Sequence, residues 1–274
     1  KKSKNRYLLA MNHYALGDVY YRYIIDNERD DKDELIKKCI THFQECEQLS
    51  REINDYGMML RAFNGLGNLY TNENQNDKAL DYYNRALAVS RKSHELFTAA
   101  IISYNVGRIY MNAGKPKDAY SYFIYAINTL ENIKAQFTPH AEVNLFLSYN
   151  SLAEVHIANE EFERAHHAID KAEEIFKSVE VLQCFEYWYI IRRAQVFFSE
   201  DKQDEGNKFL DQARDLAKSA EEKDELNKIL KEIDGKKSAV SSHSYRGIVV
   251  MAPSNQEITN ENEIKKIIAL DLIF

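Results

Sequence analysis

A pattern of small and large side chains recurs along the chain at fixed spacing, and it constrains the fold more than any other feature. Counted from Gly67, an aromatic residue follows at offset +3, a small residue at +12, a large one at +16 and a small one at +19. These residues are Tyr70, Ala79, Tyr83 and Ala86. Counted from Gly107, the same offsets give Tyr110, Ala119, Phe123 and Ala126. Repetition of this kind indicates a stack of equivalent structural units.

Three further units follow the pattern less closely. From Ala153 the offsets give His156, Ala165, Ile169 and Ala172, and from Ala194 they give Phe197, Gly206, Leu210 and Ala213. The first unit begins at Gly17 and has Tyr20 at +3. Its remaining members arrive ten residues late, as Cys39, Phe43 and Cys46. We expect these two cysteines to serve as small core residues.

Each offset has a physical reason if every unit is a pair of antiparallel helices. A small residue at the starting position, here called the anchor, lets the two helices touch. The aromatic at +3 lies one turn further along the same helix face. Small residues at +12 and +19 lie on one face of the second helix, and the large residue at +16 lies between them. Three prolines and nine glycines in 274 residues also favour long helices over many short strands with tight turns.

This pattern resembles the tetratricopeptide repeat (TPR) over roughly residues 7–220. The anchors are 50, 40, 46 and 41 residues apart, whereas the usual TPR period is about 34 residues. The long period is similar to that of kinesin light chains, of bacterial Rap and PlcR peptide receptors, and of TPR sensory halves of diguanylate cyclases. The resemblance implies an all-α fold, a right-handed superhelix (α-solenoid) of about five helix pairs.

We expect the helix pairs at 5–25 with 31–50, 54–72 with 76–91, 94–113 with 116–132, 138–159 with 161–177, and 181–199 with 202–219. Gly114 and Pro116 mark one boundary, because glycine favours a helix end and proline a helix start. A charged helix over 221–233 would cap the solenoid. We therefore expect a solenoid over 1–233 and a linker with a non-repeat tail over 234–274. The tail would begin a further domain or dock on the solenoid groove, and the linker composition favours the first.

The resemblance also implies where a ligand would bind. In this family, contacts come mostly from the residues three before and one after the anchor, on the concave face. With two neighbouring inner-face residues, the predicted peptide-binding set is Tyr14, Asp18, Asn64, Asn68, Tyr104, Asn105, Arg108, Asn150, Glu154 and Trp188. A solvated helix face is the alternative interpretation.

The chemistry of these residue types suits a peptide. A carboxamide has one acceptor and two donors, so it can pair with a peptide backbone regardless of most of the sequence. Arg108 could bind a carboxylate, and Tyr14 and Tyr104 offer flat apolar area with a polar tip. Only Arg108 fits the basic clamp by which some TPR proteins hold a chaperone tail, so that role is disfavoured.

Other classes of function find little support. The net charge of −7 disfavours nucleic acid. Three cysteines without a CxxC pair suggest neither disulfides nor a zinc cluster, and no apolar run of about 18 residues suggests a membrane span. His156 near Glu160, and His166-His167 near Glu163, could form metal pairs, but we expect His156 to be a core residue. We predict no enzyme activity, metal or cofactor.

The leading hypothesis is a cytoplasmic protein- or peptide-binding module, the sensor or scaffold part of a larger bacterial regulatory protein. Two alternatives remain open. One is the regulatory half of a signalling enzyme, a nucleotide cyclase or phosphatase. The other is an oligomerisation platform that uses exposed aromatic residues or the apolar C-terminal segment.

Overall fold

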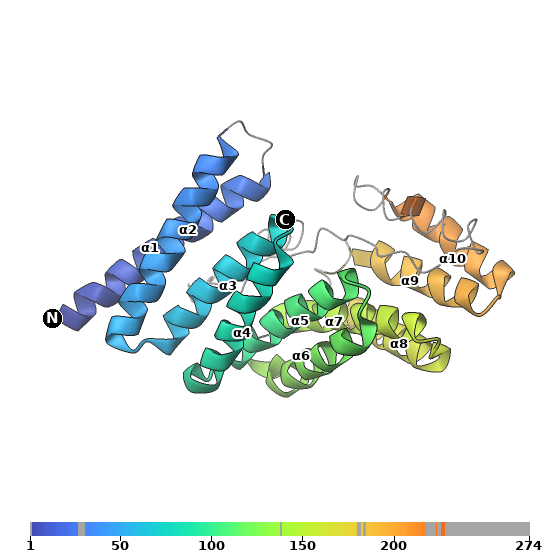
Figure 1. Cartoon of the computed structure of the whole chain (residues 1–274). Helices are drawn as coiled ribbons and strands as arrows, with labels where there is room; N and C mark the ends of the chain where they lie inside the picture. Colours follow the sequence, from blue (N-terminus) through green and yellow to red (C-terminus); the bar gives the residue numbers. More distant parts are fainter. Residues whose placement is uncertain are drawn as a thin grey trace. The chain divides into compact units, whose positions relative to one another are not determined.

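The structure is a computed structural model that describes residues 2–26, 31–137, 139–179, 182, 185–217, 223, 226 and 227. These residues form ten α-helices and contain no strand (Figure 1). The helices are α1 (Lys2–Asp26), α2 (Lys32–Ile53), α3 (Tyr56–Asn72), α4 (Asn76–Ser93), α5 (Leu96–Asn112), α6 (Pro116–Phe137), α7 (His140–Ala158), α8 (Phe162–Ser178), α9 (Glu186–Ser199) and α10 (Gln203–Leu216).

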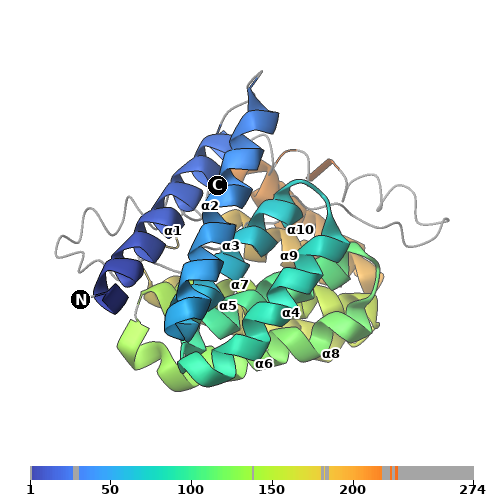
Figure 2. The ribbon, with the colours of Figure 1, turned by 60° about the vertical axis from the view of Figure 1, so that its left-hand side comes forward.

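The described residues divide into two compact units, one up to Ile109 and one from Tyr110 onward. In the first unit α1 packs on α2 and α3 on α4, while α3 also contacts α1 and α2. In the second unit each of α6 to α9 packs on the next helix, and α7 also contacts α9. Figures 1 and 2 show α1 with α2, α3 with α4, α7 with α8, and α9 with α10 as antiparallel hairpins. The expected all-α repeat fold is therefore confirmed.

The anchors are small because a ring occupies the space beside them. A Cβ added to Gly67 would lie 2.4 Å from the ring of Tyr83, and one added to Gly17 would lie 2.8 Å from the ring of Phe43. Tyr83 and Phe43 are the large residues that the repeat pattern places at +16. The sequence predicted that the anchor lies where two helices touch; the structure shows that the side chain it meets is the large residue at +16, in both hairpins of the first compact unit.

A backbone turn that the side-chain pattern did not show also recurs in each of the four helical hairpins after the first. The residue at anchor +7 has a left-handed backbone, with φ of 55°, 68°, 59° and 62° at Asn74, Gly114, Glu160 and Asp201. The amide one residue further on donates to the carbonyl at anchor +3, with N···O distances of 2.8, 2.9, 2.8 and 2.9 Å. These are the contacts of a Schellman helix end. The shared turn keeps the hairpins in the same register.

The helix boundaries agree with the sequence-based ones to within about three residues, with two exceptions: α6 ends at Phe137 instead of 132, and α9 starts at Glu186 instead of 181. Pro116 begins α6 directly after the Gly114 turn, as expected. Cys39 and Cys46 are fully buried. Burial raises the pKa of the Cys39 thiol and raises that of Cys46 to about 12, so both behave as core residues. Of the expected cap over 221–233, most lies outside the described residues, as does all of the predicted tail over 234–274.

Candidate functional site

The residues predicted to bind a peptide fall into two groups, one in each compact unit. Asn64 belongs to the first group and lies in the middle of α3. Its side chain is 3% exposed, and its Oδ1 atom has no hydrogen-bond partner in the described structure. A buried acceptor without a donor is uncommon in folded proteins. Asn64 therefore has the unused hydrogen-bonding capacity that a ligand-binding side chain requires.

Asn68, one turn after Asn64, is in a different situation. Its Oδ1 atom accepts a hydrogen bond from the Tyr83 hydroxyl at 2.7 Å and one from the Asn105 amide at 3.4 Å. The same hydroxyl lies 3.3 Å from Thr71 Oγ1. These contacts join α3 to α4 and to α5. Asn68 and Asn105 therefore hold consecutive helices together in the structure described.

The predicted residues of α1 are also engaged within the fold. Tyr14 packs against Phe43, with ring centroids 6.0 Å apart, and burial raises the pKa of its phenol. Asp18 accepts a hydrogen bond from Arg22 Nε at 3.1 Å, one helical turn away. In α5, Tyr104 is 5% exposed and Arg108 is 7% exposed. The structure thus packs the partly buried Tyr14 against the core between α1 and α2 and buries the two α5 side chains.

In the second unit, α7 carries several unsatisfied polar atoms. Asn150 occupies the same repeat position as Asn64, three before the anchor, and its Oδ1 atom is buried without a hydrogen-bond partner. The same is true of Asn144 Oδ1 and Ser148 Oγ, although the Asn144 amide donates to the His140 carbonyl at 2.8 Å. Sequence reasoning missed Asn144 and Ser148. Their spacing of four residues on one helix was the signal that could have indicated them.

Glu154 and Trp188 lie near a buried arginine that the sequence analysis did not select. Arg192 in α9 places a guanidinium nitrogen 3.4 Å from Glu154 in α7 and also donates to Gln195. The side chains of Arg192 and Glu154 are 3% and 19% exposed. Trp188, one turn before Arg192, meets the Tyr187 ring edge-on at 5.3 Å. An ion pair between adjacent helix pairs is thus part of this site.

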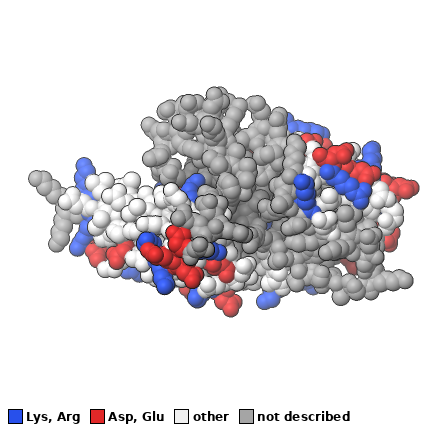
Figure 3. Space-filling model, turned by 90° about the horizontal axis from the view of Figure 1, so that it is seen from above, with Lys and Arg blue, Asp and Glu red and all other residues white. Residues whose placement is uncertain are grey.

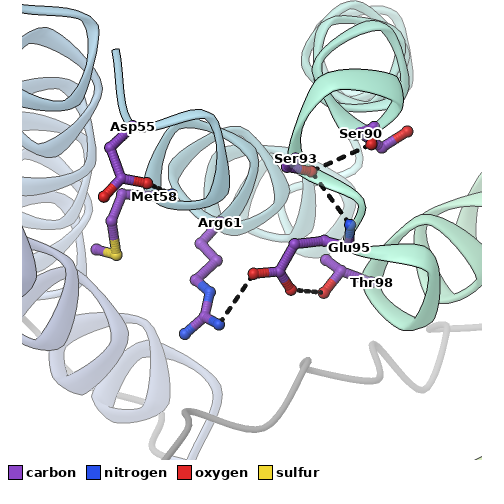
Figure 4. Close-up of polar contacts among 7 residues, drawn as sticks. All are labelled: Asp55, Met58, Arg61, Ser90, Ser93, Glu95 and Thr98. Atoms are coloured by element: carbon purple, nitrogen blue, oxygen red, sulfur yellow. Dashed lines mark hydrogen bonds and ion pairs between the residues drawn. The ribbon is translucent and has the colours of Figure 1, made fainter. Parts of the chain in front are cut away.

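A further polar group in the first unit was also missed. Arg61 lies three residues before Asn64, and its guanidinium is 3.4 Å from Glu95 at the start of α5 (Figure 4). The Thr98 hydroxyl donates to the other carboxylate oxygen of Glu95, at 3.4 Å. Asp55 caps α3 through the Met58 amide at 2.9 Å. The one-turn spacing from Asn64 places Arg61 on the same side of α3 and could have indicated it.

Charge and metal-binding features are unremarkable in the described part of the chain. Figure 3 shows basic and acidic side chains interspersed on the face in view. The described residues contain no group of three or more potential metal ligands. None of their helices combines the length and apolar character needed to cross a bilayer.

Comparison with known proteins agrees with this geometry. Residues 60–93, which cover most of α3 and all of α4, match the tetratricopeptide-repeat family. The structure of BtubC (BKLC) from P. vanneervenii is similar, with 16% identity and a TM-score of 0.53, over 89% of this chain and 97% of that one. A Podosopora anserina kinesin light chain structure with nearly identical TPR-like repeats has 14% identity and a TM-score of 0.56. That match covers 74% of this chain and 92% of that one. A sequence search of curated proteins finds no match.

The chain therefore carries a tetratricopeptide repeat, and its fold is that of TPR-like helical-repeat proteins. Repeats of this class form protein–protein interaction modules, which use the extended surfaces that stacked helix pairs provide.

Proposed function

We propose that each compact unit of this chain binds a polypeptide segment and holds it by its backbone, through an asparagine side chain of α3 in the first unit and of α7 in the second. The observation that carries the proposal is the state of Asn64 and Asn150. Both occupy the position three before the anchor, both are buried, and the Oδ1 atom of each lacks a donor. They occur in different compact units, so the same unpaired acceptor arises twice at the same repeat position.

The energetics favour a ligand that supplies N–H groups. A buried acceptor left unpaired costs about 1–3 kcal/mol. A bound peptide offers an N–H donor at nearly every residue, and one that reaches Asn64 or Asn150 would remove that cost. Backbone recognition tolerates many sequences, so selectivity would come from charged and aromatic neighbours. In the second unit these neighbours are Glu154 with its partner Arg192, and Trp188.

We further propose that the module is the cytoplasmic sensor or scaffold part of a bacterial regulatory protein. Support comes from the long repeat period, which resembles that of bacterial TPR regulators as well as that of kinesin light chains. Ligand occupancy would change the packing between neighbouring repeats and so affect whatever domain is joined to the module.

A peptide-display selection tests the binding proposal. Random twelve-residue peptides are selected on the full chain, and the best binder is measured against variants by fluorescence anisotropy. We expect the double variant Asn64→Ala with Asn150→Ala to bind about tenfold or more weakly. The matched control, Asn84→Ala with Asn128→Ala, removes one exposed asparagine from each unit and should bind like the parent. Undiminished binding by the first double variant would reject this site.

Self-association is a second candidate function, favoured by the outer surface of α1. Tyr7, Met11, Val19 and Tyr23 are 40%, 41%, 46% and 50% exposed. With the exposed Ala15 they form a row at intervals of four residues, and the row is symmetric in side-chain size about Ala15. An antiparallel second copy would place tyrosine beside tyrosine and the small Ala15 at the closest approach, as a two-fold interface requires.

Light scattering across a concentration series tests this second candidate. A dimer of the full chain that Met11→Glu with Val19→Glu converts to a monomer would support pairing through α1. The control variant Leu96→Glu changes a residue that is 49% exposed on α5 and should leave the dimer intact. A monomer at every concentration up to about 100 µM would reject self-association of this affinity.

A further inference from the structure

A pair of stacked rings recurs in the hairpins at offsets +3 and +15 from the anchor. Tyr70 stacks on Tyr82 with centroids 5.5 Å apart and planes 10° apart. The pairs Tyr110 with Tyr122 and Phe197 with Phe209 have the same centroid distance, at 20° and 6°. Tyr20 and His42 form the equivalent pair of the first hairpin, at 5.5 Å and 9°, once its ten-residue insertion is counted. Four of the five hairpins therefore place two parallel rings here.

The hairpin of α7 and α8 lacks the second ring. Its residue at +3 is His156 and its residue at +15 is Ala168, so the imidazole has no side-chain ring to stack on at that position. Tyr120 meets the imidazole edge-on, with centroids 5.8 Å apart and planes 68° apart, so it does not take the place of a stacked ring. A pocket of about 230 Å³ lies where the missing ring would be, and both His156 and Ala168 line it.

The pocket has apolar walls and a polar rim. Tyr149 and Leu152 line it from α7, at spacings of three and four residues that put them on the His156 side of the helix. Glu163, Arg164 and His167 line it from α8, and all three side chains are exposed. An apolar cavity of about 150 Å³ is large enough to hold benzene. This pocket therefore has room for a six-membered ring with a polar substituent.

The imidazole at the base of the pocket is held in place before any ligand arrives. His156 is 5% exposed, and its Nδ1 atom lies 2.6 Å from Glu161 Oε2. A carboxylate only accepts hydrogen bonds, so Nδ1 carries the proton. Arg164 also donates to this carboxylate, at 3.4 Å. Fixing the ring plane in advance lowers the entropic cost of stacking another ring on it.

We propose that this pocket is a second binding site, which takes a tyrosine side chain of a partner protein. The partner's phenol ring occupies the place that Tyr82, Tyr122 and Phe209 fill in the other hairpins, stacked on His156 and resting against Ala168. Its hydroxyl group reaches the polar rim formed by Glu163, Arg164 and His167. The site does not depend on the asparagine positions of the proposed peptide-binding function, because it is built from a different row of α7 and from α8.

The test uses p-cresol, the side-chain analogue of tyrosine, titrated into the isotope-labelled full chain and followed by NMR. We expect saturable shifts of the His156 and Ala168 amide signals at millimolar concentrations. Ala168→Phe supplies the missing ring from within the chain, so it should fold, raise the melting temperature and weaken p-cresol binding at least tenfold. Lys177→Phe, an exposed position on the same helix, is the matched control and should bind p-cresol like the parent.

A second variant keeps the test independent of how Ala168→Phe behaves. His156→Gln removes the stacking surface, keeps a donor for Glu161, and should weaken p-cresol binding at least fivefold. Two results would overturn the proposal. One is shifts absent or spread over the whole protein at 20 mM p-cresol, a concentration of order ten times a millimolar dissociation constant. The other is an Ala168→Phe variant that unfolds, because the pocket then has no room for a ring. Failure of the peptide-binding proposal at Asn64 and Asn150 would not change the results expected in these p-cresol experiments.

Discussion

The Cα of Gly67 faces the ring of Tyr83 so closely that a Cβ there would lie 2.4 Å from the ring, well inside normal contact distance. The ring cannot move away easily, because its hydroxyl group is hydrogen-bonded to Asn68 at 2.7 Å. We expect Gly67→Ala to reduce the free energy of unfolding by about 1–3 kcal/mol, the usual cost of overpacking a core. Urea denaturation of the parent and the variant would measure this change in the free energy of unfolding.

Gly57 provides the control for this substitution within the same helix. A Cβ there would approach Glu95 Oε1 at 3.2 Å, and that atom belongs to a flexible side chain. Gly57→Ala should therefore be neutral or stabilising by up to about 1 kcal/mol, since alanine favours helix over glycine. Equal destabilisation by both alanine variants would contradict the explanation given for the small anchor.

Asn64 and Asn68 are one turn apart, yet we expect opposite behaviour from them. Asn68→Ala removes an acceptor used by Tyr83 and Asn105 and should cost about 1–3 kcal/mol of unfolding free energy. Asn64→Ala removes an acceptor with no donor, so it should leave the free energy of unfolding unchanged or raise it by up to about 1–3 kcal/mol. Thermal and urea unfolding of the two variants would show the difference. A large loss of stability in Asn64→Ala would mean that this side chain is structural.

Much of the fold could be predicted from the sequence because packing constraints repeat. Gly67, Tyr83 and their equivalents encode a contact between helices, and that contact is visible as a spacing. The turn at anchor +7 could not be predicted in the same way. A left-handed backbone is usually signalled by glycine, but only Gly114 provides it, while Glu160 and Asp201 adopt it under the constraint of the hairpin.

The candidate site was less predictable. The spacing placed Asn64 and Asn68 equally well, but whether their oxygen atoms are paired depends on Tyr83 and Asn105, which lie on other helices. Likewise, the ring pairs at +3 and +15 emerge only from the distances between helices. The absence of a ring at Ala168 therefore could not be recognised from the sequence as a departure from this pattern.

The stability of the second compact unit should be sensitive to the removal of either partner of the ion pair between Arg192 and Glu154. Both side chains are largely buried, at 3% and 19% exposed. Glu154→Ala takes a carboxylate away from the buried Arg192 guanidinium and should cost about 3 kcal/mol. The double variant Glu154→Met with Arg192→Met should cost less than Glu154→Ala alone. Denaturant unfolding of the parent and both variants would measure these differences in unfolding free energy. A double variant at least as unstable as Glu154→Ala would show that the charge is not the cause.

The free energy of unfolding should also decrease as the pH is lowered, because of His42. Its imidazole lies 3.0 Å from that of His13, nitrogen to nitrogen. Burial, and then the charge of His13, lower the pKa of His42 below its usual value, although Glu45 opposes this. The unfolded chain therefore takes up the proton first, near pH 6.5. Protonation favours unfolding, so stability is lost as pH falls below about 6.5.

The variant His42→Phe isolates this effect, since phenylalanine can keep the stack on Tyr20 without titrating. We expect its melting temperature to fall less than that of the parent between pH 7.5 and pH 5. Differential scanning calorimetry at several pH values would measure both. Parallel curves for the two proteins would exclude His42 as a source of the pH dependence.

The most direct test of the central claim replaces single backbone amides of a selected peptide with esters, which removes one N–H donor at a time. If Asn64 and Asn150 accept hydrogen bonds from the peptide backbone, an ester at the matching positions should weaken binding to the parent about tenfold. The same ester should have almost no further effect on the Asn64→Ala, Asn150→Ala double variant. An ester penalty of equal size in both proteins at every position would show that these asparagines do not hold the backbone.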